Sequence, residues 1–140
     1  MMRISKEFIW EMSHRLPFLD SPCKNIHGHS YKMRVEIEGD LNELGMVLDY
    51  YDLASIVKPL IKSLDHSFIC DKNDAAVIEF LEKNNFKHHV IDSYTTAENL
   101  VIYFIDELKP KFIEYPNINT LKIRVNESID VFAEKEIVLR

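Results

Sequence analysis

The stretch CKNIHGHSY, residues 23–31, places two histidines on either side of a single glycine. In an extended strand, alternate side chains share one face, so the imidazoles of His27 and His29 would point the same way. Tyr31 and three apolar residues continue this face at every second position as far as Ile37. The alternation predicts a half-buried strand from about His27 to Glu38, with the histidine pair at its start.

A second alternating segment, from Ile4 to His14, ends in a third histidine. The loop between the two segments contains two prolines, which cannot donate hydrogen bonds to a strand ladder. Antiparallel pairing of the segments would bring the end of the first beside the start of the second. We therefore predict that His14, His27 and His29 hold a metal ion. Three imidazoles that leave one tetrahedral position open are typical of catalytic zinc, so zinc is the favoured metal.

The middle of the chain has helical periodicity. Asp49 is a favoured N-cap for a helix whose apolar residues recur at spacings of three and four as far as Leu64. Pro59 lies within this pattern, which predicts a kink or a late start of the helix. A shorter helix is expected from about Asp74 to Lys83, and a brief strand or extended link at residues 90–91.

A longer amphipathic helix follows. Thr95 or Thr96 is its expected N-cap, and Thr95 with Glu98 has the spacing of a capping box. Its buried stripe extends to Leu108, and Pro110 is expected to limit it to about one further turn. Glu98 therefore has two interpretations, as a cap residue or as a contact for a ligand.

The last quarter reads as a hairpin. Apolar and polar residues alternate from Leu121 to Val125, and a final strand is expected from about Val131 to Leu139. The element order is strand, strand, helix, helix, strand, strand. This order predicts one α+β domain over residues 1–140, with the helices on one face of a four-stranded antiparallel sheet.

Composition and charge narrow the class of protein. The 140 residues are 46% hydrophobic and 29% charged, which is ordinary for a globular domain. The net charge of −6, without a basic block, argues against a nucleic-acid partner. No apolar run is long enough for a membrane span or a signal peptide, and two cysteines in such a chain indicate free thiols. We expect a cytoplasmic protein with no membrane partner.

Cys23 lies four residues before His27, on the loop that leads to the predicted metal. Lys24 and a metal ion would both favour the thiolate, which is the reactive form. Cys23 is therefore a candidate catalytic thiol. An incidental loop cysteine and a fourth zinc ligand are the alternatives. Cys70 has no such context and is expected to pack in the core.

Other titratable groups stand in unusual contexts. Asp65 and His66 follow the predicted end of a helix, as either a proton-transfer pair or a simple helix stop. Glu127 continues an apolar stripe, where a buried carboxylate is costly unless it meets hydrogen-bond donors. Its two oxygens suit a ligand with adjacent N–H groups. His88 and His89 would face opposite sides of a strand and are expected to be surface residues.

The chain carries SHRL at residues 13–16, CKNIHGHSY at 23–31, GMVLDYYDL at 45–53, LDH at 64–66, TTAEN at 95–99 and Glu127 near its end. Together these motifs resemble the 6-pyruvoyl-tetrahydropterin synthase family over essentially the whole chain. The three residues between Cys23 and His27 resemble its bacterial branch, the 6-carboxy-tetrahydropterin synthases of queuosine biosynthesis. The pyruvoyl branch usually has a longer gap there. A third branch, in folate synthesis, carries a glutamate around the cysteine position.

The resemblance implies a tunnelling fold, in which subunits form a hexamer of two stacked trimers with sites between subunits. It implies zinc-dependent conversion of 7,8-dihydroneopterin triphosphate to 6-carboxy-tetrahydropterin, with release of acetaldehyde and triphosphate. The implied site residues are the metal ligands His14, His27 and His29, the catalytic residues Cys23, Asp65 and His66, and the substrate contacts Glu127 and Glu98. Two alternatives stay open: a pyruvoyl-tetrahydropterin synthase, which keeps the three-carbon side chain, and a non-catalytic zinc- or pterin-binding module.

Overall fold

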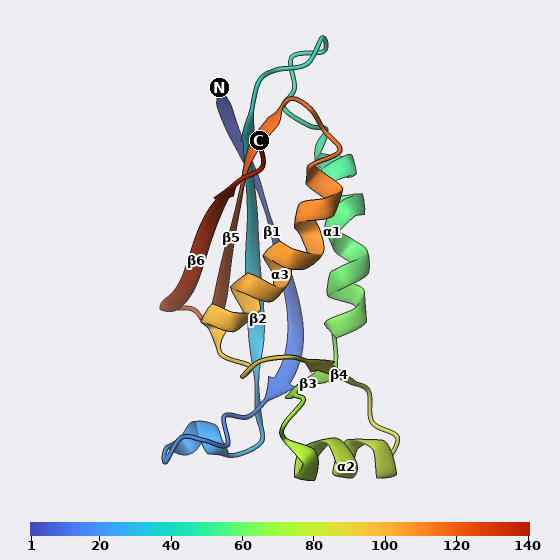
Figure 1. Ribbon diagram of the computed structural model, residues 1–140, viewed down its shortest axis with the longest axis vertical. Helices are drawn as coiled ribbons and strands as arrows, with labels where there is room; N and C mark the ends of the chain where they lie inside the picture. Colours follow the sequence, from blue (N-terminus) through green and yellow to red (C-terminus); the bar gives the residue numbers. More distant parts are fainter.

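The computed structural model describes residues 1–140 and is built on one six-stranded sheet (Figure 1). Four strands, β1 (Met2–His14), β2 (His27–Gly39), β5 (Ile118–Ser128) and β6 (Val131–Val138), pair antiparallel with their neighbours. Two short strands, β3 (Ser67–Asp71) and β4 (His88–Ile91), extend the sheet in parallel beyond β1. The order across the sheet is β4-β3-β1-β2-β5-β6.

The predicted four-stranded antiparallel sheet is therefore wrong by two strands. All five residues of β3, SFICD, are buried, so the strand lacks the polar–apolar alternation of a half-buried strand. The brief strand expected at residues 90–91 is present and begins two residues earlier, as β4. The element order is consequently β1, β2, α1, β3, α2, β4, α3, β5, β6, with a strand between each pair of helices.

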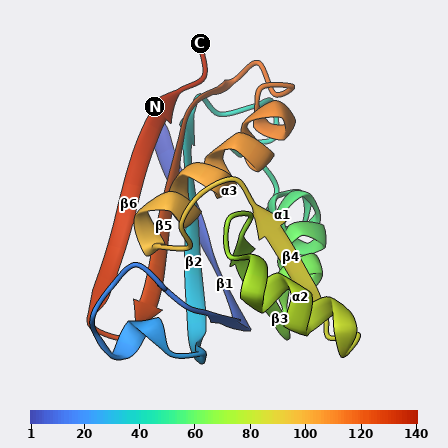
Figure 2. The same ribbon diagram turned by 60° about the horizontal axis from the view of Figure 1, so that its bottom comes forward.

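The three helices lie on two sides of the sheet. The helices α1 (Tyr50–Leu64) and α3 (Ala97–Phe112) cover the same face of the long strands (Figure 1). The short helix α2 (Ala75–Lys83) lies beside β3 (Figure 2). Its Val77 and Leu81 pack against Phe68 and Cys70 of that strand. Ile69, between those two residues, belongs to the main core instead. Because alternate residues of a strand face opposite sides, the prediction of helices on one face is wrong for α2.

The helix ends largely follow the predicted signals. Asp49 caps α1 by accepting a 2.7 Å hydrogen bond from the Tyr51 N–H, and α1 ends at Leu64 as expected. The helix includes Pro59 in its middle, so a late start is wrong, and one backbone hydrogen bond is lost there.

The structure shows which of the two expected threonines caps α3. Thr96 is the N-cap, and its hydroxyl accepts a 3.2 Å hydrogen bond from the Asn99 N–H. The capping box of Thr95 with Glu98 is therefore wrong, because Thr95 is buried below the helix start and Glu98 is exposed. Helix α3 continues past Pro110 to Phe112, which is the extra turn allowed for.

The main core lies between α1, α3 and one face of β1, β2 and β5. Trp10 stacks on Tyr31 of the paired strand at 5.4 Å between ring centroids, and Phe104 of α3 meets Trp10 edge-on at 5.6 Å. The opposite face of the sheet is polar. It carries ion pairs across strands, including Arg124 with Glu134 at 2.7 Å. None of the helices combines the length and the apolar character needed to cross a membrane.

We predict that Phe104→Ala lowers the free energy of unfolding by about 3–5 kcal/mol, because it leaves a cavity beside Trp10. Ile102→Ala, on the outer side of the same helix, is the matched control, since Ile102 is 46% exposed. It should cost less than about 1 kcal/mol. Urea denaturation followed by Trp10 fluorescence measures both changes, and equal losses would contradict this description of the core.

Candidate active site

Three histidines come together where β1 ends and β2 begins. The strand register places His14 opposite His27 and Met12 opposite His29. The ligand nitrogens of His14, His27 and His29 lie within 4.8 Å of one another, and the Nε2 atoms of His14 and His29 are 3.3 Å apart. The predicted convergence is therefore present, and the cluster could hold a metal ion.

The glycine between two of the histidines has a steric reason. A Cβ added to Gly28 would lie 3.2 Å from the carbonyl oxygen of Met12 and 3.3 Å from Oγ of Ser13, both on β1. A larger residue at this position would press on the neighbouring strand. Gly28 thus lets β2 start close against β1, which brings the rings into one cluster.

The hydrogen bonds of the imidazoles suit metal binding. Nδ1 of His14 lies 2.8 Å from the carbonyl oxygen of Thr95, and Nδ1 of His27 lies 2.7 Å from that of Asn25. A carbonyl only accepts, so Nδ1 donates and Nε2 carries the free lone pair in the neutral ring. Metal-bound histidines usually donate their other N–H to a carbonyl in this way.

Burial keeps the key imidazole neutral. It lowers the pKa of His14 to about 4, and the carbonyl of Thr95 offsets only part of this effect. The pKa of His29 is also lowered, chiefly by burial. Neutral imidazole is the form that binds a metal. The donor set therefore fits zinc, which takes nitrogen ligands readily, and the residues present are compatible with this metal.

Cys23 lies on a short 3-10 turn, Pro22–Lys24, in the loop that joins β1 to β2. The loop is held in place by its backbone: the Leu16 N–H donates to the Cys23 carbonyl at 2.8 Å. The Cys23 side chain is exposed, and no hydrogen bond of its thiol exists within the chain. Cys70 is buried, as predicted, and burial raises the pKa of its thiol to about 12.

Asp65 and His66 form a pair at the end of α1. Oδ1 of Asp65 lies 3.0 Å from Nδ1 of His66 and also accepts a 2.9 Å hydrogen bond from the Glu11 N–H. These two contacts hold the pKa of the Asp65 carboxyl below its usual range, and the hydrogen bond from the Glu11 backbone has the larger effect. Lys87 donates to the Asp65 carbonyl at 2.7 Å and so fixes the end of the helix. The residues are thus a helix stop and a side-chain pair at once.

The backbone of His66 has a φ of 57°, in the left-handed region that is costly for a residue with a side chain. Its N–H donates to the Glu11 carbonyl at 2.7 Å, which ties this conformation to β1. The imidazole itself is exposed, with 76% of its side-chain surface accessible. An exposed ring on a strained, fixed backbone suits contact with a ligand or another chain.

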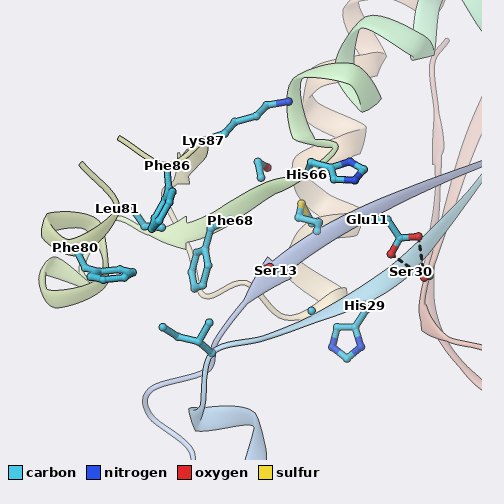
Figure 3. Close-up of a pocket in the computed structure, with 14 residues that line it drawn as sticks. Glu11, Ser13, His29, Ser30, His66, Phe68, Phe80, Leu81, Phe86 and Lys87 are labelled. Atoms are coloured by element: carbon cyan, nitrogen blue, oxygen red, sulfur yellow. Dashed lines mark hydrogen bonds between the residues drawn. The ribbon is translucent and has the colours of Figure 1, made fainter. Parts of the chain in front are cut away.

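A cavity of about 640 Å³ is lined by one histidine of the cluster and by one residue of this pair (Figure 3). His29 and His66 both line it. Glu11 and Ser30 lie between them and are joined by hydrogen bonds of 2.8 and 2.9 Å. Phe80 and Phe86 form its apolar side. Sequence patterns missed Glu11 and Ser30, because polar residues on the outer face of a strand are indistinguishable from a solvated face.

Two predicted substrate residues differ in position. Oε1 of Glu127 lies 3.3 Å from Nε2 of His14 and 3.9 Å from Nε2 of His29, so Glu127 lies beside the cluster. Glu98 is exposed on the first turn of α3 and makes no side-chain hydrogen bond within the chain. Arg15, a basic residue near the site, is held by Asp74 through hydrogen bonds of 2.6 and 2.7 Å. It is therefore not free for an anionic ligand in this structure.

One buried polar atom has no partner. The hydroxyl of Tyr31 is fully buried on the same strand face as His29, and nothing in the chain accepts its hydrogen or donates to it. The rings of Tyr31 and His29 are 5.4 Å apart. Burial, with a smaller effect of the Glu127 charge, raises the pKa of Tyr31 far above its ordinary value. The phenol therefore stays protonated.

The adjacent histidines His88 and His89 on β4 are partly buried, and His89 contacts the Tyr103 hydroxyl at 2.9 Å.

The 6-pyruvoyl tetrahydropterin synthase family model matches residues 3–136, and the chain belongs to this family. Among its relatives, a Haemophilus influenzae protein named 6-carboxy-5,6,7,8-tetrahydropterin synthase is 42% identical over 117 residues, covering 78% of this chain and 83% of that protein. A Pyrococcus horikoshii protein with the same name, marked putative, is 37% identical over 96% of this chain and 88% of its own length.

Solved structures show the same fold. The 6-pyruvoyl tetrahydropterin synthase of Plasmodium falciparum matches with a TM-score of 0.79 at 20% identity, over 98% of both chains. That of Caenorhabditis elegans matches with a TM-score of 0.70 at 22% identity, over 96% of this chain and 94% of that one. These likenesses cover nearly the whole chain and show the same α+β fold.

We predict that Zn²⁺ raises the melting temperature of the metal-free protein by roughly 5–10 °C at a hundredfold excess over its dissociation constant, since binding stabilises only the folded form. His27→Ala should abolish this increase. His88→Ala, which removes a histidine outside the cluster, should keep it. Differential scanning calorimetry after chelator treatment measures the change. An increase that survives in His27→Ala would show that zinc binds elsewhere.

Proposed function

We propose that this chain is a 6-carboxy-tetrahydropterin synthase, a zinc-dependent carbon–carbon lyase of queuosine biosynthesis. Its substrate would be 7,8-dihydroneopterin triphosphate, and its products 6-carboxy-5,6,7,8-tetrahydropterin, acetaldehyde and triphosphate. The observation that carries the proposal is the cluster of His14, His27 and His29 with Cys23 on the adjoining loop. The names of the relatives described above support the same branch.

The metal would be held by the three histidines through Nε2 of His14 and the facing nitrogens of His27 and His29. Bound there, zinc supplies Lewis-acid chemistry to hydroxyl groups of the substrate side chain. Thr95 and Asn25 keep two of the imidazoles in the ligating tautomer by accepting their Nδ1 hydrogens. Burial excludes water from His14, so this ring stays neutral and available at pH 7.

Proton transfer would fall to the thiol and the imidazole. Asp65 accepts the hydrogen of Nδ1 on His66, which leaves Nε2 of that ring free to exchange a proton with a ligand. Cys23 would carry the second proton as thiol and thiolate. Glu127 would accept hydrogen bonds from adjacent N–H groups of the pterin ring, with Glu98 as a further contact.

The site would be completed between subunits of a hexamer. Within one chain, the Cys23 thiol makes no hydrogen bond and does not line the cavity that His66 lines, and His66 pairs with Asp65 at the end of α1. The outer strand β6 leaves one edge unpaired and exposes Phe132 and Val138, at 52% and 69%. Free edges of this kind pair readily with another chain. We therefore propose that Cys23 of one subunit faces Asp65 and His66 of a second. The assembly would be cytoplasmic.

Zinc-loaded protein incubated with 7,8-dihydroneopterin triphosphate should release one acetaldehyde for each pterin consumed. Acetaldehyde is measured by coupled alcohol dehydrogenase, and the pterin product by mass spectrometry. A product that retains all three side-chain carbons would instead show a pyruvoyl-tetrahydropterin synthase. Binding of zinc and pterin without turnover would show a non-catalytic module. Either result would overturn the proposed reaction.

We predict that Cys23→Ala lowers kcat by at least about a hundredfold, since positioned acid–base groups contribute 10²–10⁴-fold. Its zinc content should stay unchanged, because the thiol is not among the ligands. Cys70→Ala, the buried cysteine, is the control for loss of a thiol. Full turnover in Cys23→Ala would exclude the proposed relay.

Subunit exchange tests whether the relay is shared. Inactive Cys23→Ala and inactive His66→Ala, when refolded together, should regain a measurable part of the activity, because some interfaces then combine an intact thiol with an intact imidazole. A mixture that stays inactive, although mass spectrometry shows mixed oligomers, would place both groups in one subunit.

A further inference from the structure

Glu127 is displaced from the regular ladder of its strand. Asn126 pairs with Phe132 and Ser128 pairs with Val131, so Glu127 has no partner on β6 and forms a bulge. Asn126 stabilises this bulge by donating from its side chain to the Val131 carbonyl at 3.2 Å. Bulges commonly redirect a side chain near a site. Here the bulged residue carries its carboxylate to the histidine cluster.

The contact between Glu127 and His14 is not a hydrogen bond. Nδ1 of His14 lies 2.8 Å from the carbonyl oxygen of Thr95, which can only accept, so in the neutral ring that binds a metal Nε2 carries a lone pair and no hydrogen. Oε1 of Glu127 faces that lone pair at 3.3 Å. Neither oxygen of Glu127 accepts a hydrogen bond from any donor in the chain. Two electron-rich atoms in this position are stabilised when one cation lies between them.

The distances from Glu127 to two of the three histidines are close to those between ligands of a single ion. Zinc binds nitrogen and carboxylate oxygen at about 2.0–2.2 Å in a tetrahedron, which puts ligand atoms about 3.3–3.5 Å apart. His14 lies at this distance from both His29 and Glu127, at 3.3 Å each, and the separation of Glu127 from His29 is 3.9 Å.

We infer that the Glu127 carboxylate is a displaceable ligand of the metal. It would occupy the fourth coordination position until a bound pterin ring draws it into hydrogen bonds. The inference rests on the proposed function, since it uses the same carboxylate and the same cluster. In the substrate-free state Oε1 completes the coordination of three imidazoles. When adjacent N–H donors of a pterin arrive, Glu127 leaves the ion and accepts their hydrogen bonds. Recognition of the ring thus opens the metal to the substrate side chain.

Cobalt in place of zinc makes the coordination visible, because the d–d absorption of Co²⁺ depends on the number and kind of its ligands. Substrate-free protein should give an intense four-coordinate spectrum. In Glu127→Gln the spectrum should change, and Co²⁺ should bind at least about tenfold more weakly. Glu136→Gln, an exposed glutamate on the neighbouring strand, is the matched control and should leave both unchanged. Circular dichroism verifies that each variant is folded.

The displacement itself is tested on the unaltered protein, with pterin (2-amino-4-oxopteridine) as the probe because it has the ring donors and no side chain. At concentrations where quenching of pterin fluorescence shows binding, the Co²⁺ spectrum should shift toward that of Glu127→Gln. An unchanged spectrum in Glu127→Gln overturns the inference even if affinity falls, since a charge acting at a distance alters affinity alone. A spectrum that bound pterin does not alter also overturns it. Acetaldehyde release by the unaltered protein reports on the proposed function separately.

Discussion

The antiparallel pairing of β1 with β2 determines the position of the other parts of the molecule. It extends from Met2 opposite Gly39 to His14 opposite His27, without a bulge. Because side chains alternate, one register places Trp10 against Tyr31 in the core and His14 against His27 in the cluster. A shift by one residue would turn both sets to the other face. Burial of the aromatic pair therefore stabilises the same register that brings the ligands together.

The neighbours of this pair supply the rest of the site. The loop after β1 carries Cys23, and β3 joins the outer edge of β1 just after Asp65 and His66. On the other side of the pair, β5 lies next to β2, and the bulge in β5 brings Glu127 to the cluster. The start of α3 provides the Thr95 carbonyl that fixes the tautomer of His14. Each contribution comes from the end of an element, where the backbone is free to change direction.

Much of this arrangement could be predicted because its signals are local. Alternation over residues 4–14 and 27–38 indicates two strands, and a histidine at the end of one beside a pair at the start of the other indicates a cluster. Asp49 and Leu64 mark the ends of α1 as observed. The contact between Asp65 and His66 follows from their adjacency in the chain.

Other features depend on contacts that the sequence pattern does not record. The strand β3 is buried on both faces, one against the main core and one against α2, so its five residues show no period. Glu11 is part of the cavity because its backbone meets Asp65 and His66 across the sheet edge. Thr95, and not Glu98, interacts with the site, because α3 begins one residue later than the capping-box spacing suggests.

The unpaired hydroxyl of Tyr31 bears on attempts to engineer this fold. A buried polar group without a partner costs about 1–3 kcal/mol, and phenylalanine would fill the same space without that cost. Selection of variants for heat resistance alone would therefore favour loss of the hydroxyl beneath the histidine cluster. Thermal screening of a library would therefore select against a polar atom that lies beside the site, so such a screen needs a readout of site chemistry alongside it.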